Sequence, residues 1–127
     1  MNPIGLPRHL RAVRGAITVD ADTPEEIKNR TVELLGEVLR RNNIENEDIV
    51  SIIFTATPDL VSDFPAAAAR EIGLSDVPLL CSQEIPVRGA VARCVRVLVH
   101  FMTRLDRSLV RHVYLREARQ LRLDLPE

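Results

Sequence analysis

The fold is decided by TPEEIKNRTVELLGEVLRR at residues 23–41 and by IVSIIFTAT at residues 49–57. In the first stretch, Thr23 is a helix-capping residue type, Pro24 suits the first helical position, and Glu26 completes a capping box. Leucine and valine then recur at helical spacing, with charged residues on the opposite side. The second stretch is apolar and rich in β-branched residues, which is typical of a strand buried on much of both faces. Together they predict a long amphipathic helix that leads into a buried strand.

The segments on either side extend this pattern. Residues 10–19 have β-branched content and period-2 spacing, which predict a strand before the helix. Strand, helix and strand in that order imply a right-handed parallel crossover. An alanine-rich segment that starts with proline and ends before glycine predicts a short helix over residues 65–72. Further strand character is found at residues 78–82, 91–103 and 110–115.

These elements predict an α+β domain, with a mixed sheet of about five strands packed against one long and one short helix. So few helices leave one face of the sheet bare, and we expect that face to meet another copy of the chain. The single domain is expected over residues 10–127. Residues 1–9 (MNPIGLPRH), with two prolines and a glycine, are expected to form a flexible N-terminal arm.

The composition is that of an ordinary globular protein, with 46% hydrophobic residues, 28% charged residues and a net charge of −1. No apolar run approaches the roughly 18 residues of a spanning helix, and the N-terminus lacks a signal-peptide core. We therefore expect a cytoplasmic protein with no membrane partner. Cys81 and Cys94 lie in apolar surroundings typical of reduced thiols, and two cysteines are too few for a four-cysteine zinc site.

Charge is distributed unevenly along the chain. Residues 20–63 carry 11 acidic against 4 basic residues, whereas residues 85–127 carry 9 arginines against 4 acids. This asymmetry fits self-association, an anionic small ligand or nucleic acid. Nucleic acid is disfavoured as a partner, because aromatic residues make up only 3% of the chain and none is interleaved with basic residues.

Three charged residues stand in or beside apolar strands: Arg14, Glu84 and Arg96. Buried charges are costly unless they are paired, so these residues either form an internal ion network, lie exposed at a sheet edge, or await a charged ligand. Spacing alone leaves all three readings open. The chain has no nucleophile elbow, no metalloprotease motif and no phosphate-binding glycine loop, and its histidines lack metal-ligand spacing.

Other conspicuous residues have ordinary structural explanations. Cys81 and Cys94 are typical of small buried hydrophobes, and Tyr114 of a residue at the edge of a core. Phe64 before Pro65 fits a hydrophobic staple, and a basic residue such as Arg70 favours a helix C-terminus.

Read in order, however, these residues resemble a known family, the monofunctional trimeric chorismate mutases of the α/β-barrel class. The resemblance runs from about Arg11 to Leu125 and rests on seven segments in the right order. They are Arg14-Gly15-Ala16, Ala56-Thr57-Pro58-Asp59-Leu60, Phe64-Pro65-Ala66, Arg70-Glu71, Cys81-Ser82-Gln83-Glu84, Cys94-Val95-Arg96-Val97 and Arg111-His112-Val113-Tyr114-Leu115. The resemblance implies a homotrimer that forms a pseudo-α/β barrel, with three active sites in clefts between neighbouring subunits.

The resemblance also implies a set of site residues. One subunit would contribute Arg14, Cys81, Glu84, Arg96 and Tyr114. The neighbouring subunit would contribute Phe64 and Arg70, and Leu121 and Arg122 of the tail would help to close the cleft. Two departures from the family pattern are Ala67, where some members carry a lysine, and a tail of only Pro126 and Glu127 after Leu125.

The implied reaction is the Claisen rearrangement of chorismate to prephenate in aromatic amino acid (Phe/Tyr) biosynthesis, with no cofactor and no metal. Arg96 and Glu84 would be the catalytic pair, and the remaining residues would bind the substrate. The alternatives are a non-catalytic trimeric module that binds a small carboxylate, and charged surfaces that serve assembly alone. Motifs of the enamine and imine deaminase family, which has a related trimeric architecture, are not recognised in the chain.

Overall fold

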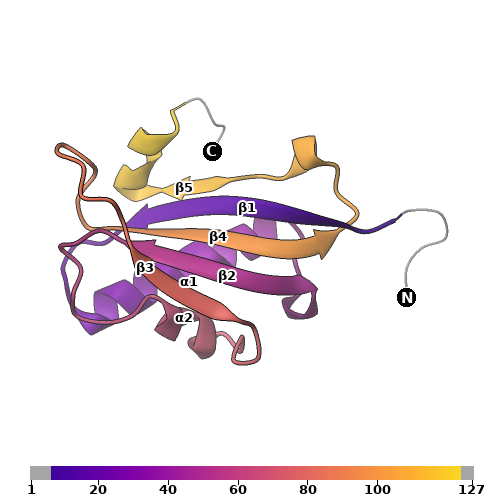
Figure 1. Cartoon of the computed structure of the whole chain (residues 1–127), viewed down its shortest axis with the longest axis horizontal. Helices are drawn as coiled ribbons and strands as arrows, with labels where there is room; N and C mark the ends of the chain where they lie inside the picture. Colours follow the sequence, from indigo (N-terminus) through magenta and orange to yellow (C-terminus); the bar gives the residue numbers. More distant parts are fainter. Residues whose placement is uncertain (1–6, 124–127) are drawn as a thin grey trace.

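The computed structural model describes residues 7–123, which fold around one five-stranded sheet. The strands are β1 (His9–Thr18), β2 (Ile49–Ala56), β3 (Leu79–Gln83), β4 (Cys94–Thr103) and β5 (Val113–Leu115). The helices are α1 (Pro24–Arg41), α2 (Ala66–Glu71) and the short 3₁₀ segments η1 (Asn46–Asp48), η2 (Arg107–Leu109) and η3 (Arg116–Leu121). Figure 1 shows the strands side by side in the order β3-β2-β4-β1-β5. The α+β class and the mixed five-stranded sheet are confirmed.

The central strand of the sheet is β4, which is antiparallel to both β1 and β2. Strands β1 and β2 are therefore parallel to each other, as the crossover prediction requires, but they are not neighbours because β4 lies between them. Parallel pairs complete the sheet at its two edges, β3 beside β2 and β5 beside β1.

Helix α1 begins where the sequence predicts, but with a different set of cap contacts. The Thr23 hydroxyl accepts a hydrogen bond from the Glu26 amide at 3.1 Å, which is the expected N-cap. The Glu26 carboxylate, however, accepts from the amide of Asp20 at 3.1 Å, whereas the Thr23 amide donates to the carbonyl of Ala21. The predicted capping box is wrong in this respect, because the turn before the helix takes up the Thr23 amide.

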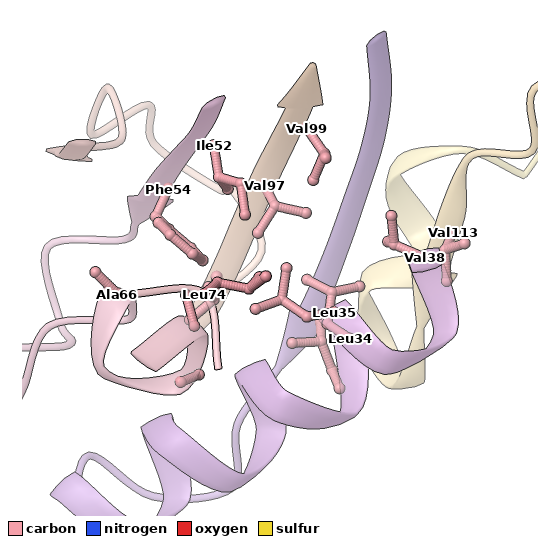
Figure 2. Packing of buried hydrophobic residues seen from close by; sticks show 14 of the residues in the cluster. Leu34, Leu35, Val38, Ile52, Phe54, Ala66, Leu74, Val97, Val99 and Val113 are labelled. Atoms are coloured by element: carbon pink, nitrogen blue, oxygen red, sulfur yellow. The ribbon is translucent and has the colours of Figure 1, made fainter. Parts of the chain in front are cut away.

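The main hydrophobic core lies between the sheet and the two helices. Figure 2 shows Leu34 and Leu35 of α1 and Leu74, which follows α2, packed with strand residues such as Phe54 and Val97. The strand residues that face this core alternate with residues that face the other side of the sheet. The helices therefore cover one face.

The opposite face has only a small cover. Ala118 of η3 packs with Ala16 and Cys94 in a second buried cluster near the edge of β5. Elsewhere on this face, Leu10 of β1 and Leu80 of β3 are largely exposed.

Within the described part of the chain, no helix is long and apolar enough to cross a membrane.

Several boundaries differ from the predicted ones. Strand β4 begins at Cys94 rather than at residue 91, because Arg93 has a positive φ of 47° that interrupts the extended backbone. Strand β1 begins at His9, and Arg8 of the expected arm forms an ion pair with Asp48 at 2.6 Å. Residues 1–6 of the expected arm and residues 124–127 at the end of the tail lie outside the described range.

Gly15 allows α1 to approach β1 closely. A Cβ atom at this position would lie 3.1 Å from Leu34 Cδ1, 3.1 Å from the Val113 carbonyl oxygen and 3.2 Å from Val38 Cγ2. We expect Gly15→Val to lower the free energy of unfolding by about 1–3 kcal/mol, because the added methyl groups overpack this contact. Urea unfolding at a fixed protein concentration measures the change.

The matched control for this prediction is Gly36→Ala. Gly36 is exposed on α1 and a Cβ atom there would have no heavy-atom neighbour within 4 Å. The free energy of unfolding of this variant should be about 0.5–1 kcal/mol higher than that of the parent, since alanine loses less backbone entropy than glycine on entering a helix. A Gly15→Val protein as stable as the parent would contradict the close-approach argument.

Candidate active site

A cavity of about 210 Å³ lies on the face of the sheet opposite α1. Four of the residues singled out from the sequence line it: Arg14, Glu84, Arg96 and Tyr114. Its other lining residues are Gly15, Ile53, Thr55, Val97 and Leu98. Apolar strand residues therefore form the floor, and the charged groups converge on it from β1, from β4 and from the segment that follows β3.

The strand register explains how residues far apart in the sequence meet here. Arg96 on β4 lies opposite Thr55 of β2 on one side and Ala16 of β1 on the other. Ala16 in turn lies opposite Tyr114 of β5. These four residues form a row across the sheet, and Arg14 is on the same face of β1, two residues before Ala16.

Glu84 reaches the row from the segment that follows β3. Its amide donates to the carbonyl of Ala56 at 2.9 Å, and its Oε2 atom accepts a hydrogen bond from the Thr55 hydroxyl. The same Oε2 atom lies 3.4 Å from Arg96 Nε. The carboxylate is thus held between a hydroxyl donor and a guanidinium.

The pairing between Glu84 and Arg96 is incomplete. The Nε atom of Arg96 is buried and makes no hydrogen bond within the described residues, although the side chain as a whole is 43% exposed. Arg14 has no ion-pair partner among the described residues. The three-residue ion network considered above therefore forms only in part, and an unsatisfied donor and an unpaired cation remain beside the cavity.

The start of β4, and so the position of Arg96, is fixed by a set of hydrogen bonds. The Thr57 amide donates to the Cys94 carbonyl at 3.0 Å, and the Cys94 amide donates to the Thr57 hydroxyl oxygen at 2.9 Å. That hydroxyl donates to Asp59 Oδ1 at 2.5 Å, and Asp59 Oδ2 accepts from the Arg93 amide at 3.0 Å. The backbone two residues before Arg96 is therefore held by both its amide and its carbonyl.

Cys94 lies two residues before Arg96, on the same face of β4, as a neutral thiol. Burial raises the pKa of Cys94 to about 11, while Arg96 opposes the rise and Glu84 reinforces it. The thiol is therefore protonated at neutral pH, and its position beside Ala16 fits the small buried hydrophobe expected from the sequence.

Comparison with known proteins identifies the family. A family model described as chorismate mutase type I matches residues 10–125. The chain belongs to the type I chorismate mutases. The resemblance found in the sequence is confirmed, and with it the assignment of the chain as a chorismate mutase, an isomerase.

Individual chorismate mutases are similar over most of their length. The chain is 52% identical over 117 residues to chorismate mutase AroH of Thermus thermophilus, with 91% of this chain and 96% of that protein covered. It is 43% identical over 117 residues to chorismate mutase AroH of Bacillus subtilis (strain 168), with 91% and 92% covered. A solved chorismate mutase from Clostridium thermocellum superposes with a TM-score of 0.86 at 44% identity, covering 87% of this chain and 98% of that one.

Two expected site residues of this chorismate mutase, Leu121 and Arg122 of the tail, are not among the residues that line the cavity, although both lie near β5. Leu121 packs with Tyr114 against Ala16 and Cys94. Desolvation lowers the pKa of His112, and the positive charges of Arg14 and Arg122 lower it further. Arg122 is therefore close enough to His112, which stands just before β5, to act on it electrostatically.

Three more of the expected site residues do not line the cavity within one chain of the mutase. Phe64, which is 68% exposed, and Cys81 line a separate hollow of about 410 Å³. Cys81 lies opposite Phe54 in the β2–β3 register and therefore points to the helix-covered face, away from Arg96. Arg70 is exposed on α2.

Sequence reasoning missed Thr55, which lines the cavity and contacts Glu84. Thr55 lies in a strand that the sequence predicts correctly, but only the β2–β4 register places it opposite Arg96. No local pattern carries that information.

The described residues contain no group of three or more His, Cys, Asp or Glu side chains that could hold a metal ion.

Proposed function

We propose that the cavity of Arg14, Glu84, Arg96 and Tyr114 converts chorismate to prephenate by electrostatic and conformational preorganisation, as a step of aromatic amino acid biosynthesis. The observation that carries the proposal is the convergence of two arginines and one glutamate on a single cavity, with a buried guanidinium donor left unsatisfied. Membership of the chorismate mutase family names the substrate that such a site would take.

The rearrangement needs charge complementarity rather than a base or a nucleophile. The carbon–oxygen bond breaks ahead of carbon–carbon bond formation, so negative charge grows on the ether oxygen and positive charge spreads over the ring. Arg96 is the proposed donor to the ether oxygen, because its guanidinium stays charged and its strand fixes its position. Glu84 is proposed to bind the ring hydroxyl and to face the cationic fragment.

The other residues act on the carboxylates and on the shape of the substrate. Chorismate is a dianion, and the cavity lining carries an excess of positive charge because Arg14 and Arg96 outnumber Glu84. Arg14 and Tyr114 are proposed to bind a carboxylate and to hold the substrate in the compact conformation that reacts. Leu121 and Arg122 are proposed to close the cavity at its tail side.

The complete site is proposed to form between subunits of a homotrimer. The face of the sheet that the helices leave bare carries the cavity and the exposed Leu10 and Leu80, which suits contact with another copy of the chain. Phe64 and Arg70 would then enter from the neighbouring subunit. Because Cys81 shares a hollow with Phe64, we assign it to that neighbouring contribution as well, rather than to the Arg96 side.

The proposed compartment is the cytoplasm. Both cysteines, Cys81 and Cys94, are free thiols in the structure. Free thiols are the usual state in a reducing compartment.

The direct test is to mix the purified protein with chorismate and to follow the loss of its ultraviolet absorbance, with prephenate identified as the product. We expect multiple turnovers of chorismate. Binding without turnover would instead favour the carboxylate-binding module, and neither binding nor turnover would leave assembly as the role of the charged surfaces.

Replacement of Arg96 tests the catalytic cation. We expect Arg96→Ala to lower kcat by at least about 10²- to 10³-fold, which corresponds to roughly 3–4 kcal/mol, with a smaller change in KM. The reason is that the ether oxygen gains its charge only as the transition state forms. Arg96→Lys should also be slow, because lysine lacks the planar fork.

The control for this prediction is Arg107→Ala, which removes an exposed arginine from η2, outside the cavity lining. It should retain the parental kcat. Near-normal turnover by Arg96→Lys would show that the wrong cation has been assigned.

Subunit mixing tests the shared site. Arg96→Ala and Arg70→Ala are expected to be slow as separate trimers, because each removes a group from every cleft. Unfolding and refolding an equal mixture should restore about a quarter of the parental activity, since that fraction of clefts receives both intact residues from random assembly. Light scattering measures the trimer, and an active monomer or a mixture without recovery would contradict the shared cleft.

A further inference from the structure

Thr55 lies inside the proposed active site but has no part in the mechanism described above. It lines the cavity and lies opposite Arg96 on the neighbouring strand. Its hydroxyl donates a hydrogen bond to Glu84 Oε2, the oxygen that also lies 3.4 Å from Arg96 Nε. Thr55 is thus a neutral group that contacts one residue of the proposed catalytic pair and lies beside the other.

Glu84 has little other support. It lies beyond the end of β3, outside any helix or strand, and its backbone amide is held by the carbonyl of Ala56 at 2.9 Å. That bond fixes the backbone but not the side chain, which has several rotatable bonds and would lose considerable entropy on being ordered. The side-chain contacts that orient the carboxylate are those with Thr55 and Arg96.

Thr55 is well suited to orient this carboxylate. It lies in β2, which pairs with β3 on one side and with β4 on the other, so its backbone is fixed within the sheet. A threonine side chain is also stiff about χ1, because it is branched at Cβ. The hydroxyl is therefore a fixed donor, whereas Glu84 is a long side chain on an irregular segment.

We infer that Thr55 is a positioning residue that acts through Glu84. Its hydroxyl holds Oε2 and thereby leaves Oε1 to meet the hydroxyl of the substrate ring. The bond also holds Oε2 at 3.4 Å from Arg96 Nε, a position in which that Nε atom makes no hydrogen bond within the described residues. This inference rests on the proposed function, because it concerns the orientation of Glu84 toward chorismate.

The test compares two substitutions at Thr55 that differ in the hydroxyl. Thr55→Val keeps the shape and the β-branch but removes the donor, and we expect kcat to fall about tenfold, the effect of losing one hydrogen bond to a charged group. The KM should change little, because Arg14 and Tyr114 still bind the carboxylates. Thr55→Ser keeps the hydroxyl and should restore most of the parental kcat.

The matched control is Thr31→Val. Thr31 is fully buried in α1, and its hydroxyl has no hydrogen-bond partner within the described residues. This variant should leave kcat unchanged, so a slow Thr55→Val would not reflect a general cost of losing a buried hydroxyl. If Thr55→Val fails to fold, as judged by circular dichroism, Thr55→Ala carries the same expectation for kcat.

A double-mutant cycle separates positioning from a general structural effect. If Thr55 acts through Glu84, the double variant Thr55→Val/Glu84→Gln should be no slower than Glu84→Gln alone. Independent, multiplicative losses in the double variant would overturn the inference, as would parental kcat in Thr55→Val. A parental protein that does not turn over chorismate would contradict the proposed function itself, whereas an active parent with either of these results contradicts only the role of Thr55.

Discussion

A guanidinium on the central strand of the sheet imposes the main constraint on this structure. Arg96 belongs to β4, which has neighbours on both sides, so its charge can be tolerated only where the sheet face is open to a cavity. The two α-helices cover the other face, and the residues that alternate with Arg96 on β4, Val95 and Val97, pack into their core. One-sided helix packing and an open charged face are two aspects of the same arrangement.

The arrangement keeps the charged groups rigid without letting them neutralise one another. Hydrogen bonds from the amides of Arg93 and Cys94 to Asp59 and Thr57 fix the backbone just before Arg96. Glu84 Oε2 lies 3.4 Å from Arg96 Nε without a hydrogen bond to it, and the same oxygen accepts from Thr55. Preorganised charge of this kind can act on a dipole that grows during a reaction, which is what the Claisen rearrangement requires.

The sequence predicts those parts of the structure that depend on local patterns. Helical spacing and the N-cap locate α1, and the apolar run locates β2, both to within a residue or so. Arg96 and Glu84 are conspicuous because charge is out of place beside apolar strands. Their roles, however, came from the resemblance of ordered segments to a family, since spacing alone left an internal ion network equally open.

What the sequence does not predict depends on contacts between distant segments. The insertion of β4 between β1 and β2, the side of the sheet that Cys81 faces and the contact of Thr55 with Glu84 all follow from strand register. The strand predicted over residues 91–103 begins only at Cys94, because Arg93 takes a left-handed conformation, which its own residue type does not favour. The 3₁₀ segment η3 was missed because it has no periodic apolar pattern.

The position of β4 also constrains how the protein is made. A ribosome releases β1, α1 and β2 first, yet these strands have no native pairing with each other, because the strand that joins them is residues 94–103. The sheet therefore cannot form until most of the chain has been synthesised, and it then closes by pairings of long sequence separation. Nascent chains of this protein therefore spend most of translation with an incomplete core.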